Sequence, residues 1–496
     1  MAPWWIIDAL CVVVVVLHTL AALALTGHAL AWVHLLWLRR RPRRARAAPP
    51  ASTRTPRLLL QLPLFNEEAV VDGLLDAVAA LDWPRDRFAV QVLDDSTDRT
   101  PARVAARLPG LRAEGLCIDH LRRADRTGFK AGALAAGLLH SDAELVAILD
   151  ADFRPRPDWL RVAVARLSPD VGLVQCRWSF TNAGSSVLTR AQALHLDAHF
   201  AVEQAGRSAG GLMLGFNGTA GVWRRAAIDA AGGWEGDTLT EDLDLAYRAQ
   251  LAGQRLVYAD DLDVPCELPE RLDAVRAQQH RWIRGGAQVA AKLLRRLWRD
   301  EPALRRRVQG TLHLLASSLF IPVLALCVIT PLTALLRAVG PAWIDLALAP
   351  AGLMLRAVPV VLVVGYFVAC RARAPGAAAA VGRVARDLLP FLVLVTALCA
   401  HNARAALLGW RGPTGTFVRT PKGATPLARR PLPETFAAEV GLAALSLGGA
   451  SVGVVTGQGG LAAFGALQAI GFTTLAAWTV VERRSLRAAP LPAVPR

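Results

Sequence analysis

Residues 145–152 read LVAILDAD, an apolar run that passes directly into two aspartates, Asp150 and Asp152. The run has the length and composition of a buried strand. In open α/β sheets, ligands bind at the carboxyl ends of such strands. Carboxylate oxygens suit Mg²⁺ or Mn²⁺, which take one or two protein carboxylates together with the phosphates of a substrate. The stretch therefore predicts a strand end with a divalent-metal site, and a solvated loop is the alternative.

Short apolar runs on both sides of this strand are separated by stretches of helical pattern. The runs lie at 58–64, 90–93 and 171–176, and the helix-like stretches lie at 69–81 and 131–140. Strands that alternate with helices are typical of a mostly parallel α/β sheet. We therefore expect one α/β domain over residues 56–309.

The chain as a whole has the composition of a membrane protein. Of its 496 residues, 53% are apolar and only 19% are charged, whereas about a quarter of the residues of soluble domains are charged. Residues 4–38 are almost entirely apolar and exceed the roughly 20 residues that span a bilayer. Arginines crowd the segment 39–46 that follows. By the positive-inside rule, this end of the span and the domain behind it lie in the cytoplasm.

Long apolar stretches return after the α/β domain, at 311–337, 343–370, 387–410, 436–456 and 460–480. Arginine-rich loops follow both the second and the third stretch, and both loops favour the cytoplasm. Because a single crossing cannot leave both loops on one side, we expect the third stretch to be an interfacial helix. The sequence thus predicts one span before the domain and four after it.

These features divide the chain into six segments. They are an N-terminal transmembrane helix (1–38), a basic linker (39–55), a cytosolic domain (56–309), transmembrane and interfacial helices (310–410), a cytosolic loop (411–432), and two transmembrane helices with a basic tail (433–496). A formal charge of +16 is also typical of nucleic-acid binding. The densest basic run lies beside an apolar span, however, so we expect a lipid bilayer as partner and no nucleic acid.

Polar residues also follow the first two predicted strands. Asn66 and Glu67 come after the first strand, and Asp94 and Asp95 end the second. Such side chains can bind a base, a ribose or a hydrated cation, although the same residue types also cap helices. Lys130, in a segment with two glycines, offers a point charge to a phosphate.

Four further motifs follow along the chain: QCRW at 175–178, FNGTAG at 216–221, TED at 240–242 and QQHRW at 278–282. A carboxylate such as Asp242 can act as a general base when it lies beside a hydroxyl group. Arg281 presents a fork of donors that fits a diphosphate, and Trp282 presents a flat face to a sugar or a base. Taken singly, Asp242 also fits the start of a helix, Arg281 an exposed arginine, and Trp282 a core tryptophan.

Taken in order, FNE, DDST, KAG, DAD, QxRW, FNGTAG, TED and QxxRW resemble the motifs of the membrane-embedded family-two glycosyltransferases, among them the cellulose, chitin and hyaluronan synthases. The forms VQCRW, FNGTAGVWR, TEDLDLAYR and QQHRW are most similar to the plant mannan-synthase-like enzymes and their bacterial relatives. The resemblance covers residues 58–286. It implies an α/β GT-A nucleotide-sugar-binding domain inserted between transmembrane α-helices, and inversion at the anomeric carbon of the sugar.

The resemblance also implies roles for individual residues. Asp242 would be the catalytic base, with Thr240 and Glu241 beside it, and Asp150 and Asp152 would hold Mg²⁺ or Mn²⁺. The nucleotide sugar would meet Asn66, Glu67, Asp94, Asp95, Lys130, Gln278, Arg281 and Trp282. The acceptor would meet Trp178, Phe216, Asn217, Gly218 and Trp282.

A further resemblance lies near the carboxyl end. Residues 417–423, FVRTPKG, resemble the gating loop of cellulose synthases, which closes over bound nucleotide. Phe417, Thr420 and Lys422 follow that pattern, whereas Arg419 stands where valine is usual. A basic membrane-proximal loop is the alternative.

One spacing remains outside the motif set. His195, His199 and Glu203 lie at positions i, i+4 and i+8, which places them on one face of a helix. Three such side chains can form a metal site. They can equally form a polar face near the path of an acceptor.

We expect a multi-pass protein of a bacterial inner membrane, with its catalytic domain in the cytoplasm. Its activity would be transfer of a hexose from UDP-glucose or GDP-mannose to a growing β-glycan. Within the same class, the alternative is a glycolipid synthase whose acceptor is ceramide or diacylglycerol. The alternative from another class is a membrane transporter, because Arg356 lies inside an apolar stretch.

Overall fold

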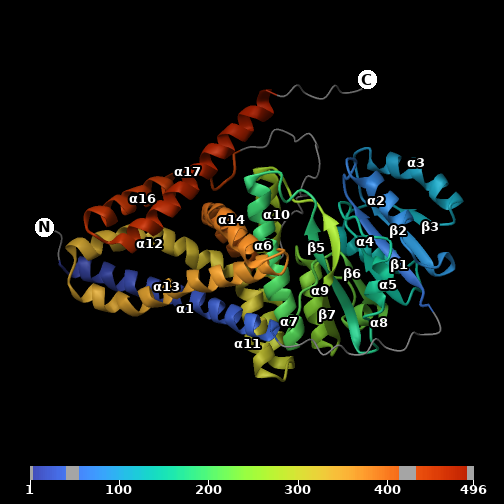
Figure 1. The fold of residues 1–496 in the computed structure, drawn as a ribbon, viewed down its shortest axis with the longest axis horizontal. Helices are drawn as coiled ribbons and strands as arrows, with labels where there is room; N and C mark the ends of the chain where they lie inside the picture. Colours follow the sequence, from blue (N-terminus) through green and yellow to red (C-terminus); the bar gives the residue numbers. More distant parts are fainter. Residues whose placement is uncertain (1–3, 41–54, 413–431, 489–496) are drawn as a thin grey trace.

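A seven-stranded sheet organises residues 58–266 in the computed structural model, which describes residues 4–40, 55–412 and 432–488. Its strands are β1 (Leu58–Leu64), β2 (Phe88–Asp94), β3 (Cys117–Leu121), β4 (Leu145–Ile148), β5 (Val171–Phe180), β6 (Gly221–Arg224) and β7 (Arg255–Cys266). They lie in the order β3-β2-β1-β4-β6-β5-β7 (Figure 1). Only β6 is antiparallel to its neighbours, β4 and β5. The predicted mostly parallel α/β sheet is therefore confirmed.

The apolar runs predict four of these strands, and the other three differ in pattern. Strands β1, β2, β4 and β5 correspond to the predicted runs at 58–64, 90–93, 145–149 and 171–176. Strand β3 lies at the sheet edge, and its residues Cys117 and Asp119 are exposed, so its apolar signal is weak. Strand β6 has four residues, and aspartates interrupt the apolar pattern of β7.

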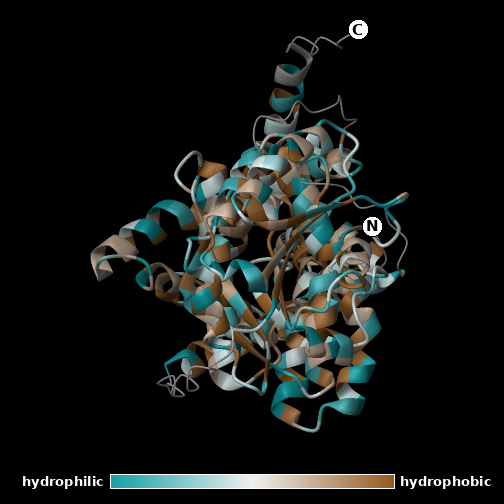
Figure 2. Ribbon diagram, turned by 90° about the vertical axis from the view of Figure 1, so that its right-hand side faces the viewer, coloured by the Kyte–Doolittle hydropathy of each residue, from teal (hydrophilic) through white to brown (hydrophobic). Residues whose placement is uncertain are grey.

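Helices cover both faces of the sheet, which is why β1 is apolar at nearly every position. Leu58, Leu60 and Leu62 pack with α2 (Val71–Ala79), α3 (Thr100–Ala113) and α5 (Trp159–Val164). Leu59 points to the opposite face and packs with α4 (Phe129–Leu138), α8 (Arg225–Ala230) and α9 (Glu241–Leu251). Figure 2 shows apolar strand segments running through the middle of this end of the molecule. The helix-like stretches at 69–81 and 131–140 correspond to α2 and α4.

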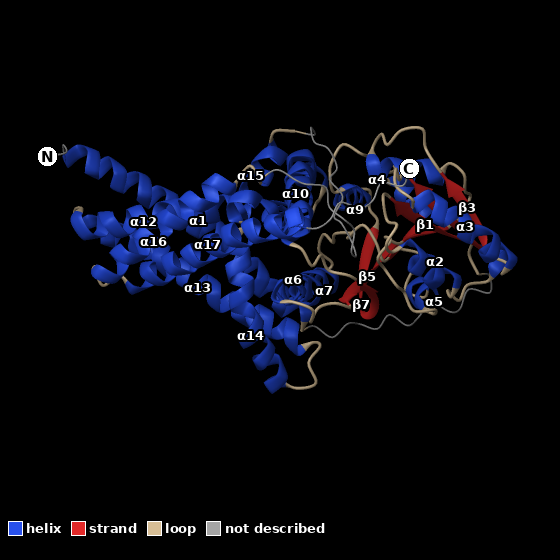
Figure 3. Cartoon of the chain, turned by 90° about the horizontal axis from the view of Figure 1, so that it is seen from above, coloured by secondary structure: helices blue, strands red, loops and turns tan. Residues whose placement is uncertain are grey.

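A bundle of helices, most of them long and apolar, lies to one side of the sheet domain (Figures 1 and 3). Its members are α1 (Trp4–Arg39), α11 (Leu304–Leu315), η3 (Ala316–Leu319), α12 (Phe320–Val339), α13 (Trp343–Arg371), α14 (Ala377–Ala397), α15 (Cys399–Trp410), α16 (Phe436–Val455) and α17 (Gly459–Ala488). Within the described residues, five helical stretches are long and apolar enough to cross a membrane: Trp5–Arg39, Leu304–Val339, Trp343–Arg371, Phe436–Val455 and Gly459–Arg484. One precedes the sheet domain and four follow it, the expected number.

Helices α14 and α15 meet at a 52° bend and would make a sixth span if counted together. The predicted stretch 387–410 covers the end of α14 and all of α15. Its assignment as an interfacial helix stays a prediction, as does the division of the chain into six segments.

Four helical segments lie where the sheet domain meets the bundle: α6 (Val187–Ala198), the π-helical turn η2 (His199–Gln204), α7 (Ala205–Gly210) and α10 (Leu272–Asp300). Buried ion pairs join the two parts. Arg276 of α10 donates to both carboxylate oxygens of Glu439 of α16, at 2.7 Å each. Arg177 of β5, 2% exposed, contacts Asp197 of α6 at 3.0 Å, and Asp197 also accepts from Arg383 of α14 at 2.7 Å.

The start of α10 has an additional contact with the bundle. Glu482 of α17 accepts hydrogen bonds from the backbone N–H groups of Leu272 and Asp273, at 3.1 and 3.2 Å. A carboxylate is stabilising at this position because the first N–H groups of a helix lack partners within the helix and carry partial positive charge. Helix α10 is thus fixed to α16 and α17 in addition to the sheet domain.

The buried pair between α10 and α16 gives a test of this junction. Glu439→Gln leaves the Arg276 guanidinium buried without its counter-charge, which costs about 3 kcal/mol or more. We expect a lower melting temperature for the full chain in detergent. Asp142→Asn is the control, because it breaks the exposed Arg57–Asp142 pair, and exposed pairs contribute little. Equal melting temperatures for the two variants would contradict the assignment.

Candidate active site

A cleft lies at the carboxyl ends of β1, β2 and β4, next to the start of α9 and the part of α10 that carries the QQHRW motif. The residues that line it include most of those predicted from the sequence: Glu67, Asp95, Lys130, Asp150, Asp152, Trp178, Asn217, Gly218, Thr240, Glu241, Asp242, Gln278, Arg281 and Trp282. The chain thus brings together residues that lie more than two hundred positions apart. Their individual roles remain predictions.

Three predicted contacts, Asn66, Asp94 and Phe216, do not line this cleft. The side-chain oxygen of Asn66 accepts a backbone N–H of the loop after β2 at 2.8 Å, so it joins the loops that follow β1 and β2. Asp94 is 1% exposed, and its carboxylate lies 2.9 Å from Nε2 of His120. Phe216 is buried and packs edge-on against Trp223. All three hold the walls of the cleft in place.

Other predicted residues fall outside the structure, and some cleft residues were not predicted. Phe417, Arg419, Thr420 and Lys422 of the predicted gating loop lie outside the described residues. Arg126 and Glu267 line the cleft without having been singled out from the sequence. Arg126 lies in the same glycine-bearing segment as Lys130, and its guanidinium stacks 3.3 Å from the centre of the Phe65 ring. Glu267 follows β7, and only recognition of that strand would have pointed to it.

Lys130 lies at the centre of the charged groups of the cleft. Its Nζ donates to Oδ1 of Asp150 at 2.6 Å and to the backbone oxygen of Gly218 at 2.9 Å. Burial lowers the pKa of Lys130, but the negative charges of Asp150, Glu241 and Asp242 outweigh burial and raise it. The ammonium group is therefore held in its charged form between the end of β4 and the start of α9.

Asp242 lies in the first turn of α9, where its Oδ1 accepts the backbone N–H of Leu243 at 2.8 Å. Burial and the neighbouring charge of Glu241 raise the pKa of Asp242 to about 7, against the lowering effect of Lys130. Burial also raises the pKa of Glu241. A carboxylate with a pKa near neutral is a suitable proton acceptor at physiological pH, and such shifts cluster at functional sites.

The two aspartates after β4 offer oxygen ligands to a divalent cation. Both line the cleft, and Asp152 is buried, at 6% exposure, while the Asp150 side chain is 37% exposed. The backbone N–H of Asp150 donates to the Thr219 hydroxyl at 2.8 Å, and the N–H of Glu267 approaches Oδ2 of Asp152 at 3.4 Å. These contacts fix the turn that carries the pair. Two hard carboxylates on a fixed turn fit Mg²⁺ or Mn²⁺.

Helix α10 supplies three more side chains to the cleft. Gln278, Arg281 and Trp282 have the spacing i, i+3 and i+4, which places them on one helix face. Burial lowers the pKa of Arg281, and the nearby charges of Glu241 and Asp150 oppose this lowering. The guanidinium group thus faces the same cluster of carboxylates as Lys130.

The TED segment and the residue before it contact α10 at two positions. A Cβ atom at Gly285 would lie 2.8 Å from the backbone nitrogen of Thr240, so the absence of a side chain lets the two backbones approach closely. The N–H of Leu239 donates to Oε1 of Gln288 at 2.9 Å. The candidate base and the candidate diphosphate-binding residues therefore lie on two elements that are packed directly against each other.

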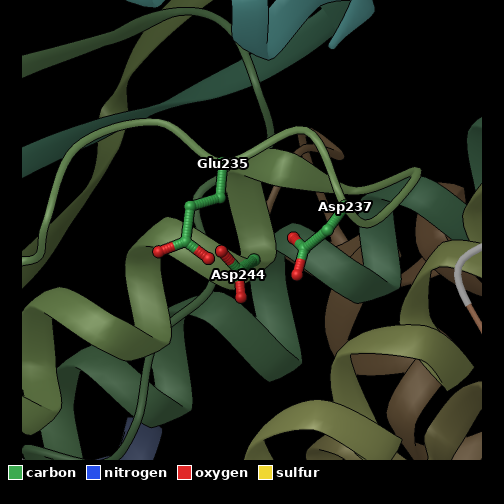
Figure 4. Close-up of side chains that lie close together, drawn as sticks. All are labelled: Glu235, Asp237 and Asp244. Atoms are coloured by element: carbon green, nitrogen blue, oxygen red, sulfur yellow. The ribbon is translucent and has the colours of Figure 1, made fainter.

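A cluster of three carboxylates completes this attachment. Glu235, Asp237 and Asp244 point toward one another (Figure 4), and one oxygen from each lies within 4.8 Å of the others. The Nζ of Lys292 of α10 lies 2.6, 2.8 and 3.0 Å from their oxygens. The guanidinium of Arg248 also lies 2.7 Å from Asp244 and 3.4 Å from Glu235. Two cations thus offset most of this negative charge, so we interpret the cluster as an ionic junction between α9, its preceding loop and α10.

Comparison with known sequences agrees with this geometry. Residues 145–369 match the family model described as Glycosyl transferase family group 2. The matched part includes the strand-end aspartates, the TED segment and the QQHRW motif. The predicted resemblance to family-two glycosyltransferases is confirmed.

Plant mannosyltransferases are among the relatives. Glucomannan 4-beta-mannosyltransferase 1 of Oryza sativa subsp. japonica is 44% identical over 278 residues, which are 53% of this chain and 53% of the relative. Glucomannan 4-beta-mannosyltransferase 2 of Arabidopsis thaliana is 41% identical over 307 residues, which are 59% of this chain and 57% of the relative. The chain thus spans about half the length of the curated relatives it matches. The predicted similarity to mannan-synthase-like enzymes is confirmed over this region.

A solved structure shares the fold. The mannosyltransferase PcManGT from Pyrobaculum calidifontis, in complex with GDP-Man and Mn²⁺, matches with a TM-score of 0.50 and 24% sequence identity. The match covers 77% of this chain and 99% of that one. Together with the sheet and the flanking apolar helices, it confirms the predicted fold class, a GT-A domain flanked by helices long enough to span a membrane.

Gly218 provides a test of the position of Asp242. Its φ of +79° favours glycine, and a Cβ atom there would lie 2.7 Å from Oδ2 of Asp242. We expect Gly218→Ala to displace that carboxylate and to slow sugar transfer by about 100-fold, since a displacement of about 1 Å can cost that much. Gly184→Ala is the matched control, because its Cβ atom meets nothing within 4 Å. Unchanged transfer rates in Gly218→Ala membranes would show that this contact does not position Asp242.

Proposed function

We propose that this protein is a membrane-bound glycosyltransferase that transfers mannose from GDP-mannose to a hydroxyl group of a growing β-glycan. The observation that carries the proposal is the convergence of Asp150, Asp152, Asp242 and Arg281 in one cleft of a family-two domain. The names of the plant relatives support mannose as the sugar and a β-linked glucomannan as the kind of product. PcManGT, which shares the fold, was solved with GDP-Man and Mn²⁺, and its ligands agree with this choice.

In the proposed reaction, an acceptor oxygen attacks C1 of the mannose, and the bond from C1 to the diphosphate oxygen breaks. The proton of the acceptor hydroxyl passes to Asp242, and the electron pair of the broken bond leaves with GDP. Asp242 suits this role because burial raises its pKa to about 7, so it is both partly ionised and basic near neutral pH. A single displacement of this kind inverts the anomeric carbon.

The leaving diphosphate requires compensating positive charge. Asp150 and Asp152 fit Mg²⁺ or Mn²⁺, and such a bound cation would neutralise part of the charge that develops on the diphosphate. Lys130 and Arg281 line the same cleft and would bind the remaining phosphate oxygens. Lys130 contacts Asp150 directly, so the cation-binding and phosphate-binding groups form one unit.

The remaining residues of the cleft divide between donor and acceptor. Glu67 and Asp95 lie at the ends of β1 and β2, where the nucleotide would bind. Asp95 is itself held by Arg123 at 3.0 Å. On the acceptor side, Trp282 offers a ring face to a sugar. Trp178 also lines the cleft, and its ring would contact the acceptor.

Asn66, Asp94 and Phe216 take a different part in this proposal. They hold the loops after β1 and β2 and the FNG segment, rather than touch the donor or the acceptor. Gln278 is only 8% exposed and lines the cleft beside Arg281. It would bind the donor through its side-chain amide.

The protein would work at the cytoplasmic side of a membrane. The five apolar helical stretches support insertion in a bilayer. The arginine-rich run after the first stretch supports a cytoplasmic sheet domain. A bacterial inner membrane is the location that we propose.

The test uses membranes that contain the full chain or its Asp242→Asn variant. Radiolabelled GDP-mannose or UDP-glucose is supplied with Mn²⁺ or Mg²⁺, and the label is measured in polymer, lipid and free-sugar fractions. We expect mannose in the polymer fraction and a fall of about 100-fold or more in Asp242→Asn, because general-base catalysis contributes 10²–10⁴-fold. Asp86→Asn is the control, since that side chain is 78% exposed.

Each of the other outcomes would change a different part of the proposed function. Label from UDP-glucose would change the donor, and label in lipid would change the acceptor to that of a glycolipid synthase. Full activity of Asp242→Asn would remove this residue as the base. No transfer from either donor by a folded protein would contradict the proposed function.

A further inference from the structure

A series of hydrogen bonds connects the cleft with the first apolar helix. Trp32 of α1 donates from Nε1 to Oε1 of Glu203 at 2.8 Å. The other carboxylate oxygen of Glu203 lies 2.9 Å from Nδ1 of His199. The Nε2 atom of His199 lies 3.0 Å from the side-chain nitrogen of Asn217, which lines the cleft. The series therefore joins side chains separated by 185 positions, from Trp32 to Asn217.

With a neutral His199 ring, these groups fit together in one arrangement of their hydrogen atoms. An ionised carboxylate can only accept, so Nδ1 of His199 donates to Glu203 and Nε2 becomes the acceptor. The amide nitrogen of Asn217 then donates to Nε2, and the amide oxygen of Asn217 accepts from Gln204 at 2.5 Å. Burial raises the pKa of Glu203, but the hydrogen bond from His199 and the charge of Arg207 outweigh it and lower that pKa. Glu203 thus stays ionised and fixes every member of the series.

The local backbone is built to present these side chains in different directions. His199, Glu203 and Gln204 lie on η2, a π-helical turn between α6 and α7. Such turns are rare and often occur at functional sites. In this turn Glu203 reaches α1, while Gln204 reaches the FNG segment.

Helix α1 lies close against this region. A Cβ atom at Gly206 of α7 would lie 2.6 Å from the backbone oxygen of Leu35, so only glycine allows this approach. Trp32 itself is buried, at 6% exposure. The end of the series at α1 is therefore fixed by packing as well as by its hydrogen bond.

The other end of the series reaches the catalytic groups through the backbone. The N–H of Asn217 donates to Oε1 of Gln175 at 2.9 Å. The next residue, Gly218, accepts from Lys130 and lies against the carboxylate of Asp242. A shift of Asn217 would therefore move the groups that surround the candidate base.

The spacing of His195, His199 and Glu203 does not assemble a three-ligand site. The ring of His195 stacks on Phe391, with the ring centres 5.4 Å apart. Only His199 and Glu203 contact each other. Glu203 orients the imidazole of His199 in the way that the carboxylate of a catalytic triad orients its histidine. The imidazole of His199 in turn binds Asn217.

We propose that Trp32, Glu203 and His199 are positioning residues that fix Asn217, and with it the acceptor side of the cleft, relative to the first membrane helix. The proposal rests on the proposed function. It predicts that these residues control how well an acceptor competes with water for the donor, because a displaced acceptor site still allows hydrolysis. Donor binding also depends on Arg281 and on the strand ends, which lie outside the series, so it would change less than the use of the acceptor.

The test compares Trp32→Phe with Trp5→Phe in the full chain. The first variant removes the N–H that binds Glu203, and the second makes the same change at an exposed position of the same helix. With GDP-mannose as donor and mannotetraose as the acceptor probe, we expect Trp32→Phe to raise the ratio of hydrolysis to transfer by about 10-fold, the effect of losing one hydrogen bond to a charged group. Trp5→Phe should leave the ratio unchanged. Partial unfolding would lower both rates and leave their ratio unchanged.

A double variant tests whether the residues act in series. Asn217→Ala removes the end of the series, so adding Trp32→Phe to it should not raise the ratio further. Multiplicative effects of the two substitutions would overturn the proposal, as would an unchanged ratio in Trp32→Phe alone.

Backbone hydrogen exchange gives a readout that does not depend on activity. We expect Trp32→Phe, but not Trp5→Phe, to accelerate exchange in peptides that cover residues 214–221. If the wild-type protein transfers no mannose, the proposed function fails, and this measurement still decides the positioning role. Equal exchange in the two variants would overturn that role.

Discussion

Like charges that share one buried cleft are the constraint on which the site depends. Asp150, Glu241 and Asp242 lie close together, and burial and the neighbouring negative charges raise the pKa values of Glu241 and Asp242. Carboxylates that lie farther apart would cost the folded state less free energy. Lys130 and Arg281 make the arrangement stable by placing two cations against the cluster. The same pattern of charges is suited to a ligand that carries phosphates and a divalent cation.

The fold meets this constraint by bringing distant elements to one end of the sheet. The carboxyl ends of the parallel strands β1, β2 and β4 lie at the cleft, and residues of α9 and α10 line it as well. Helix α10 has a double role, since one face carries Arg281 and the other binds the bundle through Arg276. The candidate site is therefore held by the apolar helices as well as by the sheet. The contact between Trp32 and Glu203 is a second such attachment.

Local patterns in the sequence predict the parts of the site that follow directly from a strand or a motif. The apolar run 145–149 is followed directly by Asp150 and Asp152, and this order of residues alone indicates a site at the end of a strand. Asp94 differs, because its carboxylate binds His120 of β3, an edge strand whose alternating exposed residues give little apolar signal. Glu267 reaches the cleft only because β7 pairs with β5, a pairing that no local pattern contains.

The most direct measurement of the central claim is equilibrium binding of GDP to the purified full chain in detergent, with Mn²⁺ and after chelation by EDTA. We expect chelation to weaken GDP binding by about 10-fold or more, since a cation held by Asp150 and Asp152 would also attract the phosphates of GDP. We also expect Asp152→Asn to remove this dependence on Mn²⁺, whereas Asp86→Asn preserves it. Equal affinity for GDP with and without Mn²⁺ would contradict the claim that Asp150 and Asp152 hold a nucleoside diphosphate through a divalent cation.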